Sequence, residues 1–186
     1  MLNKIVDWDI DTLVFLNNLG SEQFDAFWVT VTQITTWIPL FLLFFILIFR
    51  KHSKRESFFM LLAILFTTVA VVIEMGVVKE LVARLRPNNT PELNGLIRIL
   101  KNPNDYSFFS GHASSSFAIT TMVVLLIKRK YKWVWVLFLW PILFAYSRIY
   151  VGVHFPLDIL VGIAVGLLNA MLFFWLYKKI TKPYLV

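Results

Sequence analysis

Five long apolar runs constrain the fold of this chain more than any other feature of its sequence. A helix rises about 1.5 Å per residue, so about 20 apolar residues cross roughly 30 Å of hydrocarbon. The runs cover residues 25 to 49, 57 to 78, 113 to 127, 133 to 149 and 157 to 177. Hydrophobic residues make up 59% of the chain, against roughly 45–50% in an average soluble domain. We therefore expect an all-α, polytopic membrane bundle of about five transmembrane helices, formed by a single domain over residues 1–186.

The segment before the first run is amphipathic. Asp7, Asp9 and Asp11 alternate with apolar side chains, and a glycine ends the pattern. We expect residues 1–24 to contain a helix that lies in the membrane interface; counting it as a span would give six. The start of the chain lacks a basic leader with an apolar core and a cleavage site, so no removable signal peptide is expected. The third run is rich in serine and threonine, which predicts that it packs inside the bundle.

Lysine and arginine gather after the first, third and fifth runs. Such residues accumulate in cytoplasmic loops, so these ends are expected inside and the opposite ends outside. The clusters hold 11 of the 18 cations: Arg50, Lys51, Lys54, Arg55, Lys128, Arg129, Lys130, Lys132, Lys178, Lys179 and Lys182. The net charge of +7 therefore indicates membrane topology and no nucleic-acid partner. Lys4, Arg84, Arg98 and Lys101 are expected to be ordinary charges on the outer side.

One long connection, from Pro87 to Ser110, combines turn formers with a short apolar patch. Such a loop is typical of a lid or a substrate platform, and an ordinary solvated connection is the alternative. Because polar motifs flank it, we expect residues 86–112 to form an outer-face loop that carries part of a site. The chain has no cysteine, which excludes a disulfide framework and a thiol nucleophile.

The first polar motif is Lys79-x6-Arg86-Pro87. On a helix that continues to Pro87, seven residues are nearly two turns, so the two cations would share a face and converge on one anion. Two snorkelling cations at a membrane interface are the alternative.

The second motif is Ser110-Gly111-His112, at the start of the third run. The first N–H groups of a helix that begins there are unpaired and suit phosphate oxygens. Alternatively, Ser110 is only a helix N-cap and His112 an ordinary interfacial histidine.

The third motif is Ser147-Arg148-x5-His154-x3-Asp158. A carboxylate four residues after a histidine can orient one ring nitrogen while the other faces a substrate, as a nucleophilic histidine requires. Arg148 adds a planar cation suited to phosphate, or to a carboxylate partner. Asp158 is alternatively a helix-start residue behind Pro156.

Together the three motifs resemble those of the type 2 phosphatidic acid phosphatase (PAP2) family, whose pattern is K-x6-R-P, P-S-G-H and S-R-x5-H-x3-D. The chain has K-E-L-V-A-R-L-R-P at 79–87, F-S-G-H at 109–112 and S-R-I-Y-V-G-V-H-F-P-L-D at 147–158. Phe109 replaces the usual proline, which shapes a turn and supplies no reacting group. The resemblance runs from about the second apolar run to the fifth.

The resemblance implies a phosphatase in which His154 attacks phosphorus, Asp158 orients His154, and His112 protonates the leaving oxygen. The implied phosphate-binding residues are Lys79, Arg86, Ser110, Gly111 and Arg148. It implies no metal and no other cofactor. The third histidine, His52, lies in a basic loop and is expected to be solvated.

By analogy with small bacterial members of the family, the substrate is expected to be a lipid phosphate, either undecaprenyl diphosphate or a glycerophospholipid phosphate. The site would face the periplasm or exterior of a bacterial cytoplasmic membrane. A lipid A phosphatase and a lipid phosphotransferase are the alternatives among enzymes. A non-enzymatic subunit of a membrane complex is the alternative from another class, although the intact catalytic set favours an enzyme. The sequence leaves the oligomeric state open.

Overall fold

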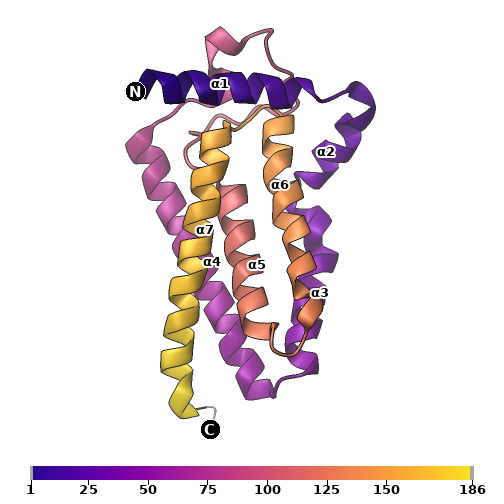
Figure 1. Ribbon diagram of the computed structural model, residues 1–186, viewed down its shortest axis with the longest axis vertical. Coiled ribbons are helices and arrows are strands. Elements are labelled where there is room, and N and C mark those ends of the chain that lie inside the picture. Colours follow the sequence, from indigo (N-terminus) through magenta and orange to yellow (C-terminus); the bar gives the residue numbers. More distant parts are fainter. Residues whose placement is uncertain (1, 185–186) are drawn as a thin grey trace.

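The computed structural model describes residues 2–184, which form helices and short connections without any strand. The α-helices are α1 (Leu2–Asn18), α2 (Asp25–Val31), α3 (Ile38–Arg50), α4 (Lys54–Val82), α5 (Gly111–Ile127), α6 (Leu139–Tyr150) and α7 (Pro156–Thr181). Short 3₁₀ segments cover Glu22–Phe24, Ile34–Trp37, Pro87–Asn89, Pro91–Leu93, Lys132–Phe138 and Lys182–Tyr184. Helices α3 to α7 form the bundle, and α1 lies across one of its ends (Figure 1). The predicted all-α bundle is confirmed.

The apolar runs become the helices of this bundle. Within residues 2–184, three segments are long and apolar enough to cross a membrane: Lys54–Leu93, Lys132–Tyr150 and Pro156–Tyr184. A fourth is the bent pair Glu22–Val31 and Ile34–Arg50, and the shorter apolar helix α5 corresponds to the third run. Large apolar side chains on the outside of α4 are exposed, among them Ile73 at 61% and Leu81 at 79%. A lipid environment would cover them, as expected for a membrane protein.

The first predicted span is broken. Its two parts, on either side of Thr32 and Gln33, are bent by 69°. Side-chain donors satisfy carbonyls near the break: Thr36 Oγ1 donates to Thr30 O at 2.7 Å, and Trp37 Nε1 donates to Val31 O at 2.9 Å. These bonds allow a bend at a depth where water is scarce, since an unpaired carbonyl there is costly. The bend brings the hydroxyl of Thr32 to the candidate site.

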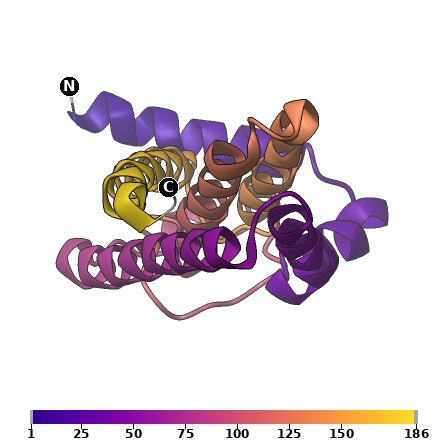
Figure 2. The same cartoon turned by 90° about the horizontal axis from the view of Figure 1, so that it is seen from below.

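Helix α5 occupies the interior, as its serine and threonine content predicts. It contacts α3, α4, α6 and α7, and Figure 2 shows it among these helices from the end where the chain finishes. Its most extensive packing is against α7, where Gly166 permits the close approach. A Cβ atom at Gly166 would lie 2.4 Å from the carbonyl oxygen of Ser114. This crossing sets the relative positions of the second and third motifs, which lie just above it.

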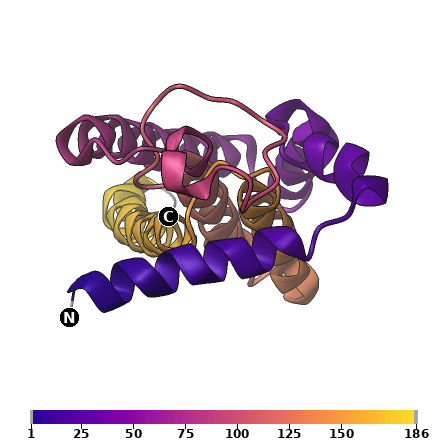
Figure 3. The ribbon, with the colours of Figure 1, turned by 90° about the horizontal axis from the view of Figure 1, so that it is seen from above.

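Helix α1 and the long loop lie together across one end of the bundle (Figure 3). Leu13 of α1 packs with Leu93 and Ile97 of the loop in one buried cluster. The side-chain oxygen of Asn17 accepts a 2.6 Å hydrogen bond from the backbone N–H of Arg98, and its amide donates to the Arg98 carbonyl at 3.0 Å. These contacts pack the middle of the loop onto the end of the bundle. The basic clusters after α3, α5 and α7 lie at the opposite end.

The prediction that Arg98 is an ordinary outer charge is wrong. Its guanidinium donates two hydrogen bonds of 2.6 Å to the carboxylate of Asp25. Its side chain is only 24% exposed, and it also packs 5.6 Å from the ring of Tyr150. Arg98 therefore joins the long loop to α2 and α6.

Candidate active site

The first motif does not lie on one helix. Helix α4 ends at Val82, and Ala83 follows with a φ of 49°, in the left-handed region that closes many helices. Arg86 lies beyond this cap in extended backbone. The expectation that α4 continues to Pro87, with Lys79 and Arg86 on one helical face, is therefore wrong. The reason is that the cap stops the helix four residues before the proline.

Lys79 and Arg86 nevertheless converge. Lys79 Nζ lies 2.5 Å from Asp105 Oδ2, and Arg86 Nη2 lies 2.9 Å from the same oxygen. The side chain of Arg86 is 5% exposed and that of Lys79 is 11% exposed. The turn after the cap therefore brings the two cations together, as a continuous helix was expected to do.

The second motif forms the start of α5. Ser110 is the N-cap, and its hydroxyl accepts a 3.4 Å hydrogen bond from the N–H of Ala113. The N–H of Ser110 donates to the carbonyl of Asp158 at 3.0 Å, which ties the second motif to the third. The ring of His112 lies 4.8 Å from the ring of Phe144, within electrostatic reach of His154. Ser110 is therefore the N-cap of α5, as the alternative interpretation of this motif predicted.

The third motif forms the turn between α6 and α7. His154 Nδ1 lies 3.3 Å from Asp158 Oδ2, and the same oxygen accepts a 3.0 Å hydrogen bond from the N–H of Phe155. His154 Nε2 lies 3.0 Å from Arg86 Nη1, on the side of the converging cations. Gly152 has a φ of 76°, and a Cβ there would lie 2.5 Å from the carbonyl oxygen of Arg98. Only glycine fits this turn without strain.

The environment of His154 favours the neutral imidazole. Its side chain is 1% exposed. Burial, followed by the charges of Arg86, Arg148 and Lys79, holds its pKa well below the ordinary value of 6.5. An unprotonated ring nitrogen carries the lone pair that a nucleophile needs.

Arg148 reaches the same region from α6. Its Nη1 donates to the hydroxyl of Thr32 at 2.5 Å, whereas its buried Nε has no hydrogen-bond partner within residues 2–184. A buried guanidinium donor without a protein partner is suited to binding an anion. All eight residues predicted for the site thus lie at one end of the bundle.

Comparisons with known proteins agree with the motifs. The family model described as the PAP2 superfamily matches residues 57–182. This chain belongs to the PAP2 superfamily. The match spans α4 to α7 and contains all three motifs, so the family predicted from the sequence is confirmed.

Individual relatives of this PAP2 protein are membrane phosphatases. The lipid A 4'-phosphatase of Bacteroides thetaiotaomicron is 28% identical over 186 residues, covering 97% of this chain and 82% of the relative. The undecaprenyl-diphosphatase of Sulfolobus acidocaldarius is 36% identical over 155 residues, or 83% of this chain and 64% of the relative. The predicted enzyme class, a phosphatase, is thereby confirmed.

Two solved structures are similar. Aquifex aeolicus LpxE has a TM-score of 0.65 and 29% identity, covering 89% of this chain and 93% of that one. The transmembrane PAP2-type phosphatidylglycerolphosphate phosphatase from Bacillus subtilis has a TM-score of 0.76 and 21% identity, covering 96% of this chain and 88% of that one. The second similarity shows that the fold is shared.

Asp105 contacts the motif cations of this PAP2 protein but is not part of any of the three motifs. This residue lies in the long loop, and its carboxylate occupies the position where the motif cations converge. Although burial raises it, the pKa of the Asp105 carboxyl is lowered overall by the hydrogen bonds and charges of Arg86 and Lys79. The available signal was weak: Asp105 is one of two acidic residues, with Glu92, between Pro87 and Ser110.

The prediction that Arg84 is an ordinary charge is also wrong. Its Nη1 donates to Asp158 Oδ1 at 2.9 Å, and its Nη2 donates to Asp9 Oδ2 at 2.6 Å. The second oxygen of Asp9 accepts a 2.7 Å hydrogen bond from the N–H of Leu157, at the start of α7. Asp9 and Asp158 are both fully buried. Asp9, Arg84 and Asp158 thus form a chain of charges that leads from α1 to His154, with both carboxylates buried.

A spacing in α1 carries the signal for Asp9. Asp9, Leu13 and Asn17 are four residues apart, so they share one face of the helix. All three are fully buried, whereas Asp7 and Asp11 are exposed. A polar residue on the apolar face of an amphipathic helix needs a buried partner, and Arg84 is that partner.

Proposed function

We propose that this PAP2 protein hydrolyses a phosphomonoester or diphosphate of a membrane lipid, without a metal ion, through a phosphohistidine on His154. The geometry of the His154 ring is the observation that supports this most directly. Nδ1 lies 3.3 Å from the carboxylate of Asp158, and Nε2 lies 3.0 Å from Arg86. One nitrogen is thus oriented by an anion, while the other faces the cations suited to a phosphate.

In the first step, Nε2 of neutral His154 attacks phosphorus, and the bond from phosphorus to the leaving oxygen breaks. The departing oxygen takes the bonding electron pair and a proton from His112, so the lipid leaves as an alcohol or as a lipid monophosphate. Asp158 stabilises the positive charge that develops on the ring of His154. The charge on the non-bridging phosphate oxygens is stabilised by Lys79, Arg86, Arg148, the Ser110 hydroxyl and the Gly111 N–H.

In the second step, water attacks the phosphohistidine. His112, now unprotonated, accepts a proton from the water as its oxygen bonds to phosphorus. The bond between phosphorus and His154 breaks, and its electron pair returns to Nε2. The step releases inorganic phosphate and restores both histidines to their starting states.

The substrate that we propose is undecaprenyl diphosphate or a glycerophospholipid phosphate. The apolar outer surface and the site at the end of the bundle favour a phosphate at head-group level, with its lipid tail among the helices. The undecaprenyl-diphosphatase of Sulfolobus acidocaldarius supports the first substrate. The Bacteroides relative supports lipid A phosphate as a third candidate. We place the protein in a bacterial cytoplasmic membrane with the site facing outward, because the basic clusters lie at the opposite end.

Phosphate release from these three kinds of lipid, in detergent with a chelator present, tests the proposal. We expect release by the native protein and a loss of at least about 10³-fold in the His154→Ala variant, since the nucleophile is removed. Rapid acid-free quenching with a radiolabelled substrate should trap label on the native protein and none on the variant.

The chain offers a matched control, because it has only three histidines. His52 lies at the opposite end, where its Nδ1 is 2.9 Å from the carbonyl oxygen of Ile48, so His52→Ala should retain activity. Chelator-sensitive release, or label that persists in His154→Ala, would contradict the mechanism. Transfer of label to a lipid acceptor instead of water would indicate a phosphotransferase.

A further inference from the structure

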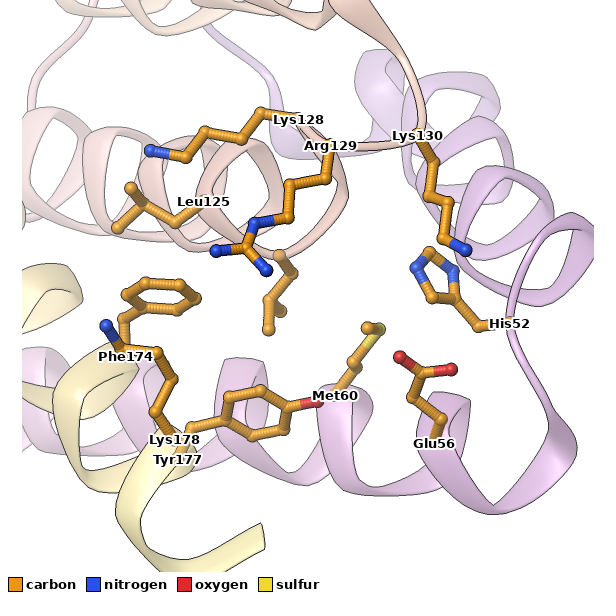
Figure 4. A pocket seen from close by; sticks show the side chains of 11 residues that line it. His52, Glu56, Met60, Leu125, Lys128, Arg129, Lys130, Phe174, Tyr177 and Lys178 are labelled. Atoms are coloured by element: carbon orange, nitrogen blue, oxygen red, sulfur yellow. The ribbon is translucent and has the colours of Figure 1, made fainter. Parts of the chain in front are cut away.

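A cavity lies at the end of the bundle opposite to the candidate active site. Its volume is about 590 Å³, and α4, α5, α7 and the turn after α5 form its walls. Figure 4 shows Arg129 reaching into it from the α5 side, with Tyr177 of α7 and Glu56 of α4 on the other side. We call it the basic cavity, because Lys128, Arg129, Lys130 and Lys178 all line it. His52, predicted to be solvated, also lines it and is half-buried.

The positive charge in the basic cavity is not neutralised by the protein. Glu56 is the one acidic residue in its lining. None of the four cations takes part in a salt bridge within residues 2–184. Lys178 instead lies 5.0 Å from the ring of Phe174. Cations that line one cavity repel one another, so an anion between them would be bound favourably.

An apolar groove adjoins the basic cavity. It has a volume of about 240 Å³ and lies between α4 and α7, where Phe59, Leu62, Phe66, Phe173 and Ile180 line it. Tyr177 lines both the groove and the basic cavity. A tyrosine, with an apolar ring and a polar tip, suits the boundary between an anionic head group and an acyl chain.

The need for cytoplasmic charge does not account for this arrangement. Seven other cations lie at the same end of the chain's helices without lining the cavity: Arg50, Lys51, Lys54, Arg55, Lys132, Lys179 and Lys182. Topology alone requires charge near the helix ends and no particular geometry. The four cations of the basic cavity instead line one hollow, which shares Tyr177 with an apolar groove.

We propose that the basic cavity binds the phosphate of an anionic phospholipid, with one acyl chain in the groove between α4 and α7. The bound lipid belongs to the leaflet at the end opposite to the candidate active site. Basic pockets between membrane helices bind such head groups by charge and hydrogen bonding. This site is separate from the phosphatase site, and the proposal does not depend on the function proposed above.

Lipid binding measured by native mass spectrometry tests the proposal. The protein is titrated in a mild detergent with dioleoyl phosphatidylglycerol, whose phosphodiester is not a substrate for the proposed phosphatase. We expect one saturable phosphatidylglycerol site, and binding about tenfold weaker in the Arg129→Gln/Lys178→Gln double variant. The matched control, Arg55→Gln/Lys182→Gln, removes the same charge from the same end and should bind like the native protein. Equal losses in both double variants would overturn the proposal.

Two further measurements separate the lipid from other sources of phosphate and from misfolding. Millimolar inorganic phosphate should not displace the lipid, and dihexanoyl phosphatidylglycerol should bind at least tenfold more weakly, since its chains leave the groove empty. Displacement by phosphate, or equal binding of both chain lengths, would refute a lipid site. The Arg129→Lys/Lys178→Arg variant keeps the charge and should retain binding; its failure to bind while folded would also contradict the proposal.

Discussion

Asp9 offers the sharpest test of how the site is positioned. Its carboxylate accepts a 2.6 Å hydrogen bond from Arg84 and a 2.7 Å hydrogen bond from the N–H of Leu157. Asp9 makes no hydrogen bond to Lys79 or Arg86, so we expect it to affect catalysis through Arg84 and Asp158. Asp9→Asn should therefore lower kcat while leaving KM nearly unchanged.

The magnitude follows from the contacts that are lost. A hydrogen bond between charged groups contributes about 1.5–3 kcal/mol, and Asn keeps the neutral bond to Leu157. The side chain of Arg84 is 23% exposed, so water replaces part of the lost contact, and Arg84 keeps its bond to Asp158. A net effect of about 1–2 kcal/mol on the transition state corresponds to roughly a 5- to 30-fold decrease in kcat.

Steady-state phosphate release from the preferred lipid measures both constants. Asp7→Asn and Asp11→Asn are matched controls, since both carboxylates lie exposed on the same helix, and both variants should behave like the native protein. Asp9→Glu should restore part of kcat. A raised KM at unchanged kcat in Asp9→Asn would contradict a positioning role for Asp9. So would a loss of activity in Asp9→Asn that only matches the loss of folded protein measured by thermal unfolding.

Three further predictions concern the loop, the helix crossing and pH. Asp105→Asn should lower KM about fivefold, because the Asp105 carboxylate, which is 56% exposed, competes with the substrate phosphate and contributes about 1 kcal/mol. Glu92→Gln, in the same loop, should leave KM unchanged. An unchanged KM in Asp105→Asn would contradict the competition. Gly166→Ala should destabilise the protein by about 1–3 kcal/mol in thermal unfolding, since its Cβ would lie 2.4 Å from a backbone oxygen, whereas Gly76→Ala, with open space around it, should not. The free energy of unfolding should decrease as the pH falls below 6.5, because His154 has a lowered pKa in the folded protein and takes up a proton on unfolding. If the free energy of unfolding of His154→Asn depends on pH with the same slope, His154 is not the cause.

Much of the bundle was predictable because its determinants are local. The apolar runs at 57–78 and 157–177 lie within α4 and α7, since lipid exposure of a helix depends on about 20 consecutive residues. Ser110 as an N-cap and Pro156 as the first residue of α7 are equally local signals. The end of α4 was not predictable in this way, because its last turn contains good helix formers and only the left-handed Ala83 stops it.

The residues of the candidate site also fall into two groups, those identified from the local sequence and those identified only from the packing. The sequence by itself determined which residue types are available, because the motifs name His154, Asp158 and their cations by spacing alone. Only the tertiary structure decided which acidic residues outside the motifs contact the site. Asp9 is indistinguishable from its neighbours Asp7 and Asp11 as a letter in the sequence, and its partner Arg84 is 75 residues away. The energy of a buried ion pair depends on distance and on exclusion from water, and packing of α1 onto the end of the bundle creates both.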